Sequence, residues 1–169
     1  MPDVLSPQQR HDNMSAIRSK DTKPEIIVRK WLWSRGFRYR INSKRLPGKP
    51  DIVLRKYRTC IFINGCFWHG HMLSFAQSEE RRVKSEEWPE SSECCKIPKT
   101  NTAFWVEKIK RNTEHDAEVR QQLKRMGWHS LTLWTCQLKP KERDNTLQSL
   151  VCALDDIYLK NHNAKLVEA

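Results

Sequence analysis

The sequence lacks any apolar run of the about eighteen residues that a membrane-spanning helix requires, and its mean hydropathy is −0.77. It has only 5 glycines, and none of them forms the glycine-rich loop that cradles a nucleotide phosphate. A charged segment followed by an apolar one, typical of a secretory signal, is also missing from its start. These absences exclude a membrane protein, argue against a nucleotide-dependent enzyme of small molecules and favour a cytoplasmic location.

What the chain has instead is positive charge and tryptophan. Its 169 residues carry 31 Lys+Arg against 20 Asp+Glu, a net charge of +11, together with 7 Trp and 6 Cys. A chain of this length predicts one domain over residues 1–169. The charge indicates a polyanionic partner, most simply nucleic acid. In a cytoplasmic protein the cysteines are expected as metal ligands or free thiols; Cys60 and Cys152 are expected to be buried thiols.

The hydrophobic pattern predicts an α/β fold, a central mixed sheet of about four strands with helices on both sides. A polar, marginal and flexible helix is expected within residues 1–20, a surface insertion over 74–96 and a final amphipathic helix over about 140–160. The remaining expected elements are a helix over 22–36, strands at 37–41, 51–54, 59–63 and 128–134, and a long helix over 101–126.

Two local patterns make these expectations specific. Thr22 and Glu25 are spaced as a capping box at the start of a helix, which is a sufficient structural explanation for Glu25. In the segment 37–41 apolar residues alternate with arginines, so a strand with one buried and one basic face is expected.

Asp51 follows a proline-containing turn at the start of the second strand. A carboxylate in this position can hold a hard cation such as Mg²⁺ and leave coordination sites for water and phosphate. Taken alone, Asp51 is equally well explained as a turn residue that caps the strand.

Cysteine and histidine gather in the loop after the third strand and again near residues 94 and 136. Zn²⁺ in structural sites takes four nitrogen or sulfur ligands. Cys66, His71, one of Cys94 and Cys95, and Cys136 would supply three sulfurs and one nitrogen, and we favour a metal site over buried free thiols.

His69 remains outside this ligand set, between the aromatic residues Phe67 and Trp68 and a glycine. A neutral imidazole can accept a proton from water. The long helix places Asp116 within a stripe that is otherwise largely apolar, so Asp116 is a natural partner for His69, or else the stripe turns to solvent there. Phe67 and Trp68 fit either the core or a wedge between DNA base pairs.

With these pieces in order, the sequence resembles the very short patch repair (Vsr) DNA mismatch endonucleases over residues of about 10–138. The matching segments are NMSAIR at 13–18, TKPE at 22–25, LPGKPDIV at 46–53, IFINGCFWHGH at 61–71, PKTNTAFWVEKI at 98–109 and WTC at 134–136.

This resemblance implies a restriction-endonuclease-like core, a structural Zn²⁺ and a catalytic Mg²⁺. It implies a monomer that nicks one strand 5′ of the T in T:G mismatches left by 5-methylcytosine deamination, with a cytosine-5 DNA methyltransferase as a functional partner. The resemblance implies that Asp51 and the Ile63 backbone bind Mg²⁺, that His69 is the general base with Asp116 as its partner, and that Glu25 assists. It implies zinc binding by Cys66, His71, Cys95 (or Cys94) and Cys136. The residues that it implies for DNA binding are Phe67, Trp68, Trp105, Lys108, Asn112 and Asn64.

The sequence departs from the family pattern at three places. The third cysteine follows the insertion instead of standing near Leu73, Ile63 replaces a threonine, and Asn64 replaces a histidine. Two other functions also stay open for a protein with these features. A restriction-type nuclease would cut both strands of paired DNA, whereas a zinc-stabilised DNA-binding module would not bring Asp51, His69 and Asp116 together.

Overall fold

A four-stranded sheet forms the centre of the computed structural model, which describes residues 5–73 and 93–167. The strands lie in the order β1-β2-β3-β4; the first three are antiparallel neighbours, and β3 and β4 are parallel. This is the predicted α/β fold with a mixed sheet. The strands are β1 (Arg40–Ile41), β2 (Ile52–Leu54), β3 (Thr59–Asn64) and β4 (His129–Trp134).

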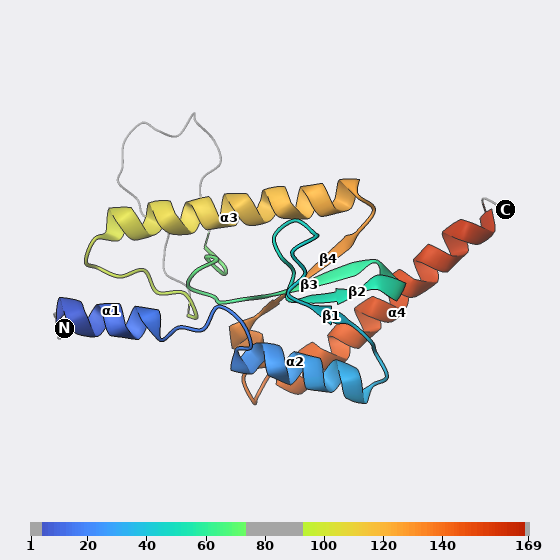
Figure 1. The fold of residues 1–169 in the computed structure, drawn as a ribbon, viewed down its shortest axis with the longest axis horizontal. Helices are drawn as coiled ribbons and strands as arrows, with labels where there is room; N and C mark the ends of the chain where they lie inside the picture. The colour runs from blue at the N-terminus through green and yellow to red at the C-terminus, as the bar shows by residue number, and fades with distance from the viewer. Residues whose placement is uncertain (1–4, 74–92, 168–169) are drawn as a thin grey trace.

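Helices cover both faces of the sheet (Figure 1). α3 lies on one side, and α2 and α4 lie on the other. The helical segments are α1 (Pro7–Ser15), α2 (Lys23–Ser34), η1 (Arg55–Tyr57), α3 (Thr102–Arg125), η3 (Thr135–Leu138) and α4 (Arg143–Val167). None of these helices is both long enough and apolar enough to cross a bilayer.

The alternation of side chains along β2 and β3 divides the core in two. Ile52, Leu54 and Ile61 pack with the apolar residues of α2 and α4, whereas Val53 and Cys60 pack with Val119 and Leu123 of α3. Successive residues of a strand point to opposite faces, so both faces of this sheet are buried. The three-layer arrangement therefore follows from the continuous apolar runs that the sequence shows.

Two predicted local structures are wrong. Only Arg40 and Ile41 of the segment 37–41 pair as a strand, and both are exposed, while Phe37 is part of the core. The Thr22 hydroxyl makes no capping bond to the α2 backbone. Glu25 instead accepts hydrogen bonds from the Asp21 N–H (2.9 Å) and the Thr22 hydroxyl (2.8 Å), so the capping box does not form.

The other predicted elements differ mainly at their ends. α1 is shorter than the expected helix and has no buried residue, and α4 extends past the expected end at about residue 160. Most of the predicted insertion, residues 74–92, lies outside the described residues. In its last part Glu93 and Lys96 are exposed, as expected of a surface segment, whereas the Cys95 side chain is fully buried.

Candidate active site and metal centre

A cavity of about 440 Å³ opens between α3, the start of α2 and the end of β3. Its walls include all four residues predicted to be catalytic, namely Glu25, Asp51, His69 and Asp116, and also Asn64. They come from four separate parts of the chain. The structure thus brings Asp51, His69 and Asp116 together, which is the opposite of what the non-catalytic binding module predicts.

Asp51 is positioned by the turn before β2 and by β3 beside it. One carboxylate oxygen, Oδ2, accepts a hydrogen bond of 2.7 Å from the Ile63 N–H. Burial raises the pKa of Asp51 above its ordinary value; the Ile63 hydrogen bond opposes this shift and the nearby Glu25 carboxylate adds to it. The ionised carboxylate is therefore poorly solvated, and a bound cation would stabilise it.

His69 and Asp116 form a close pair in which Nδ1 of His69 lies 2.6 Å from Oδ2 of Asp116. A carboxylate only accepts hydrogen bonds, so Nδ1 carries the hydrogen and Nε2 is left as the acceptor. The loop holds His69 from the other side, since its N–H donates to the Gly65 carbonyl. Of the two readings of the α3 stripe, the structure supports the one in which Asp116 pairs with His69.

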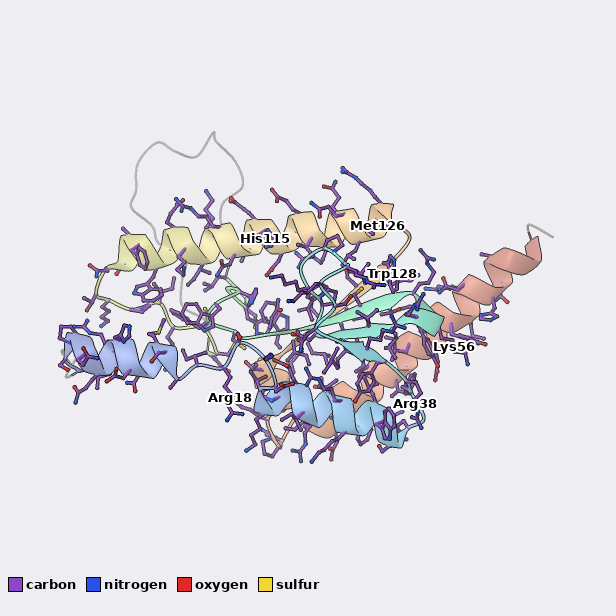
Figure 2. All side chains as sticks on the ribbon, in the orientation of Figure 1. Arg18, Arg38, Lys56, His115, Met126 and Trp128 are labelled. Atoms are coloured by element: carbon purple, nitrogen blue, oxygen red, sulfur yellow. The ribbon has the colours of Figure 1, made fainter. Side chains whose placement is uncertain are left out.

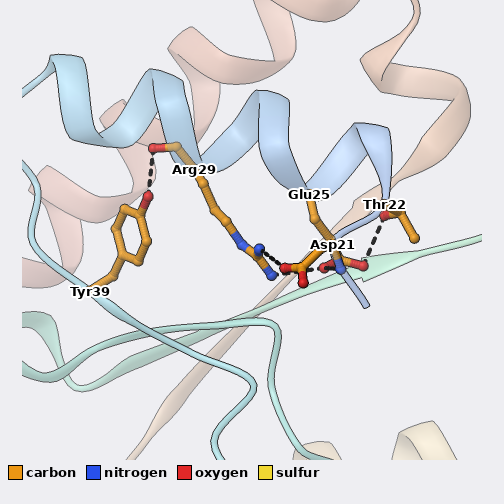
Figure 3. Close-up of polar contacts among 5 residues, drawn as sticks. All are labelled: Asp21, Thr22, Glu25, Arg29 and Tyr39. Carbon is orange, nitrogen blue, oxygen red and sulfur yellow. Dashed lines mark hydrogen bonds and ion pairs between the residues drawn. The ribbon is translucent and has the colours of Figure 1, made fainter. Parts of the chain in front are cut away.

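Glu25 is 5% exposed and belongs to a polar network that Figure 3 shows. Arg29 donates to Glu25 Oε2 (2.8 Å) and to Asp21 Oδ1 (2.5 Å), and its carbonyl accepts from the Tyr39 hydroxyl. Arg29 neutralises a carboxylate that would otherwise be buried without a counter-charge. Arg29 was not among the predicted site residues, although its spacing of four residues from Glu25 indicates an ion pair on one helix face.

The predicted metal ligands converge on one point beside the cavity. The ligand atoms of Cys66, His71, Cys94 and Cys136 all lie within 4.8 Å of one another. Nδ1 of His71 is 3.1 Å from Sγ of Cys94 and 3.4 Å from Sγ of Cys136. Three sulfurs and one imidazole nitrogen at these separations form a donor set that suits tetrahedral Zn²⁺.

The structure distinguishes the two adjacent cysteines. Cys94 belongs to the cluster, whereas the buried Cys95 thiol faces the Phe67 carbonyl at 3.8 Å. Burial, together with the neighbouring Cys94 and Cys66, raises the pKa of Cys95 to about 11. Cys95 is thus a packing residue. The other two cysteines were both expected to be buried, which is right for Cys60 and wrong for Cys152, which is exposed on α4.

The charges in the cluster also suit a cation. Although burial opposes ionisation of Cys66, hydrogen bonds from Thr135 and the neighbouring cysteines outweigh it and lower the pKa of this thiol. Burial and the nearby Cys66 and Cys94 raise the pKa of Cys136 to about 12. Without a cation, one thiolate therefore disfavours the next, and a divalent ion would remove this conflict.

An aromatic cluster lies beside the cavity. The ring centroids of Phe67, Trp68 and Trp105 are 5.2 to 6.1 Å apart. The Asn112 amide donates to the Trp68 carbonyl (2.7 Å) and so fixes the loop against α3. Phe104, which was not among the predicted site residues, adds a ring 5.2 Å from Trp105 and is 58% exposed.

Several cationic side chains complete the surroundings. Lys108 is not in the main cavity but borders a smaller hollow beside Phe104 and Asn112. Arg18, Lys49 and Arg120 also line the main cavity, and none of them was predicted as a site residue. Arg18 and Lys49 belong to the matching segments 13–18 and 46–53 but were given no role there, and Arg120 belongs to no matching segment. The three meet only through the fold.

The cavity thus combines a half-buried carboxylate with a carboxylate-oriented histidine, the arrangement of a hydrolytic site. Comparison with known proteins gives the family. A model of the DNA mismatch endonuclease Vsr family matches residues 2–74. The DNA mismatch endonuclease Vsr of Escherichia coli K12 is 35% identical over 85% of this chain and 80% of its own length.

Two type II nicking enzymes are also similar. V.NmeAIP of Neisseria meningitidis serogroup A is 43% identical over 83% of this chain and 87% of its own length. V.NaeI of Lentzea aerocolonigenes is 30% identical over 90% of this chain and 79% of its own length. The chain belongs to the Vsr family and is a DNA mismatch or nicking endonuclease.

Proposed function

We propose that this protein nicks one DNA strand 5′ of the T in T:G mismatches that arise when 5-methylcytosine is deaminated, by Mg²⁺-dependent hydrolysis of one phosphodiester bond. The observation that carries the proposal is the His69–Asp116 pair, which shares a cavity with Asp51 next to the aromatic cluster of Phe67, Trp68 and Trp105. Catalytic groups and a wedge for opening the duplex thus lie side by side.

Asp51 and the Ile63 backbone carbonyl are the proposed Mg²⁺ ligands. Asp51 fits this role because only Oδ2 is engaged by the Ile63 N–H, and no described residue bonds to Oδ1. When bound, Mg²⁺ would polarise the phosphate and stabilise the negative charge on the leaving oxygen. Glu25, held in place by Arg29, lines the same cavity and assists near the metal.

His69 is the proposed general base. Its free Nε2 accepts a proton from the attacking water while the water oxygen bonds to phosphorus and the bond to the leaving sugar oxygen breaks. Asp116 fixes the tautomer and stabilises the imidazolium that forms. Asn64, which is 7% exposed and lines the cavity, can donate to a phosphate oxygen without adding charge.

The aromatic cluster is the proposed mismatch reader. Phe67, Trp68 and Trp105 would enter the base stack, and a mismatched step costs less to open than a paired one. Asn112 holds the Trp68 backbone, and Lys108, which is close to it on α3, is placed for a phosphate. The cost of unstacking then contributes to the choice of T:G over T:A.

Zn²⁺ is the proposed structural ion of Cys66, His71, Cys94 and Cys136. These residues follow β3, precede α3 and follow β4, so an ion among them would hold the catalytic loop against the sheet. The ring of His71 also stacks on Trp134 with centroids 4.1 Å apart, which fixes its orientation.

The test is a nicking assay on three duplexes of one sequence, carrying a central T:G, T:A or C:G pair, with Mg²⁺ and with EDTA. We expect one nick, 5′ of the mismatched T, only in the T:G duplex and only with Mg²⁺. Equal nicking of T:A would refute mismatch specificity, and cleavage of both strands of paired DNA would indicate the restriction-type nuclease. Binding without any nicking would indicate the non-catalytic module.

Two further parts of the proposal have their own measurements. A monomer predicts elution at the mass of one 20.1 kDa chain at working concentration. The link to a cytosine-5 DNA methyltransferase predicts that the sequence context preferred in nicking matches the context that such a methyltransferase modifies. Nicking assays across T:G mismatches in varied flanking sequences measure this preference.

A further inference from the structure

A second hollow of about 480 Å³ lies at the C-terminal end of α3. Its walls come from the last turns of α3 and the start of β4, and they include Arg120, Lys124 and Trp128. Figure 2 labels Met126 and Trp128 at this end of the helix. No residue of the catalytic machinery proposed above lines this hollow.

The hollow is continuous with the catalytic cavity through one side chain. Arg120 lines both of them. Asp116, Arg120 and Lys124 follow one another at four-residue intervals on one face of α3, and each interval advances about 6 Å along a helix. This step is comparable to the separation of neighbouring phosphates along one DNA strand.

Within residues 5–73 and 93–167, the cations of this face have no acidic partner. Further back on α3, Lys110 is paired with Glu114 and Arg111 with Glu107. Arg120 and Lys124, in contrast, form no ion pair with any acidic residue of the described segments, and both are exposed.

The spacing of Arg120 and Lys124 from each other does not stabilise α3. Like charges four residues apart destabilise a helix. The helix dipole favours cations only in the last turn, and Arg120 precedes the last turn of α3. A face that retains such a pair is suited to an external anion.

Arg58 holds the backbone at the end of α3, where Gly127 and Trp128 line the hollow. Arg58 donates from Nε to the Gly127 carbonyl and from Nη2 to the Met126 carbonyl, both at 3.0 Å. Its guanidinium also lies over the Trp128 ring at 5.3 Å. These contacts tie the end of α3 to the turn between β2 and β3, so the hollow exists before any ligand binds.

We propose that this hollow binds the backbone of duplex DNA next to the cleaved bond. We name it the α3 groove and define it by Arg120, Lys124 and Trp128. Arg120 contacts the phosphate one nucleotide from that bond, and Lys124 contacts the next phosphate on the same side. This assignment rests on the proposed function, because the two phosphates are counted from the cleaved phosphate, which that function places at Asp51 and His69. Its charge and its continuity with a nuclease cavity favour DNA over an acidic peptide.

The first experiment measures affinity against salt. The double variant R120Q/K124Q and the wild type are titrated by fluorescence anisotropy with a labelled duplex that carries a central T:G, and with its fully paired counterpart, in EDTA. Each lost phosphate contact lowers the slope of log K against log salt by about 0.9, so we expect a total change of about 2 and a Kd about tenfold to a hundredfold higher near 0.1 M salt.

The matched control is K139Q/K141Q. It removes the same charge from two exposed lysines between η3 and α4, and we expect the wild-type slope. Unchanged affinity and slope in R120Q/K124Q would overturn the proposal. Thermal melting checks that each variant folds, and K124Q alone, at an exposed site, replaces the double variant if that one does not.

The second experiment locates the contacts. Single methylphosphonates, which lack the phosphate charge, are placed at each position within three nucleotides of the cleavage site on both sides. In the wild type we expect weaker binding at the first two positions on one side only, and in R120Q/K124Q no further loss at these positions. Additive losses, or equal losses on both sides, would overturn the register.

These measurements separate the two proposals. If the wild type does not nick T:G duplexes, the proposed function fails, while the salt slope on the paired duplex still decides whether the α3 groove binds DNA. If nicking is specific but the slope is unchanged, only the α3 groove proposal fails.

Discussion

At the scale of single residues, the proposed chemistry depends on the orientation of His69. The 2.6 Å contact with Asp116 fixes which ring nitrogen carries the hydrogen. An asparagine at position 116 has a similar shape but can present an NH₂ group to Nδ1, which favours the wrong tautomer. The orientation of the pair can therefore be tested separately from its presence.

We expect Asp116→Asn and His69→Ala each to lower the nicking rate by about a hundredfold or more, because both remove an oriented general base. Binding to a T:G duplex should change little, since neither side chain is in the aromatic cluster. Single-turnover nicking and anisotropy measure the two quantities. Glu118→Gln, at an exposed acid on the same helix, is the control, and a loss of rate equal to that of Asp116→Asn would contradict this role for the pair.

The adjacent cysteines give a second test at this scale. Cys94→Ser should reduce the bound zinc of the purified protein strongly, because Sγ of Cys94 is in the ligand cluster. Cys95→Ser should retain the zinc, since its thiol faces a backbone carbonyl instead. Elemental analysis of both variants measures this. The reverse pattern would mean that Cys95 is the ligand.

Sequence alone could place some site residues and not others. The periodicity of α3 placed Asp116 on the correct face, because residues three or four apart lie on the same face of a helix. It could not choose between Cys94 and Cys95, because adjacent residues project in different directions and the choice depends on how the preceding segment enters. Arg120 was overlooked because nothing along the chain links it to Asp51.

At the scale of elements, the turn 46–50 packs closely against α3. Gly48 has a φ of +73°, and a Cβ built there would lie 2.5 Å from Cγ1 of Val119 and 3.2 Å from Cε1 of Phe62. Val119 is a buried, branched residue of α3, so it cannot move aside easily. This glycine therefore allows the turn that precedes Asp51 to approach α3.

We expect Gly48→Ala to lower the free energy of unfolding by about 2–4 kcal/mol, through backbone strain and overpacking together. Gly36→Ala is the matched control, because Gly36 has a φ of +86° but nothing within 4 Å of the added Cβ. It should cost only the strain, about 1 kcal/mol. Urea unfolding measures both. Equal losses would show that close approach to Val119 is unimportant.

The elements were most predictable where burial determines them. The apolar runs of β2 and β3 could be identified because strands buried on both faces are continuously apolar. The stripe of α3 could be identified because a helix buried on one face leaves a period in the sequence. The segment 37–41 has the pattern of a strand, yet only two residues pair. Only Arg40 and Ile41 pair with β2 at this edge of the sheet. Phe37 instead packs in the core against Tyr57, with ring centroids 5.4 Å apart.

At the scale of the whole molecule, the Cys/His cluster joins segments that are distant in the chain. Cys66 and His71 follow β3, Cys94 precedes α3, and Cys136 lies in η3 after β4. The unfolded chain does not hold these four ligands together, so the free energy of binding the ion adds to the stability of the native state. The free energy of unfolding should therefore depend strongly on bound metal.

We expect removal of zinc to lower the melting temperature. A ligand at a thousandfold excess over its Kd stabilises the native state by about 4 kcal/mol, which corresponds to roughly 10 °C for a chain of this length. Differential scanning fluorimetry with and without a zinc chelator measures the shift. Cys136→Ser should melt low in both conditions, whereas Cys152→Ser, at an exposed thiol on α4, should respond as the wild type does. A chelator effect of the same size in Cys136→Ser would place the metal elsewhere, because a site without this sulfur loses one of its four ligands.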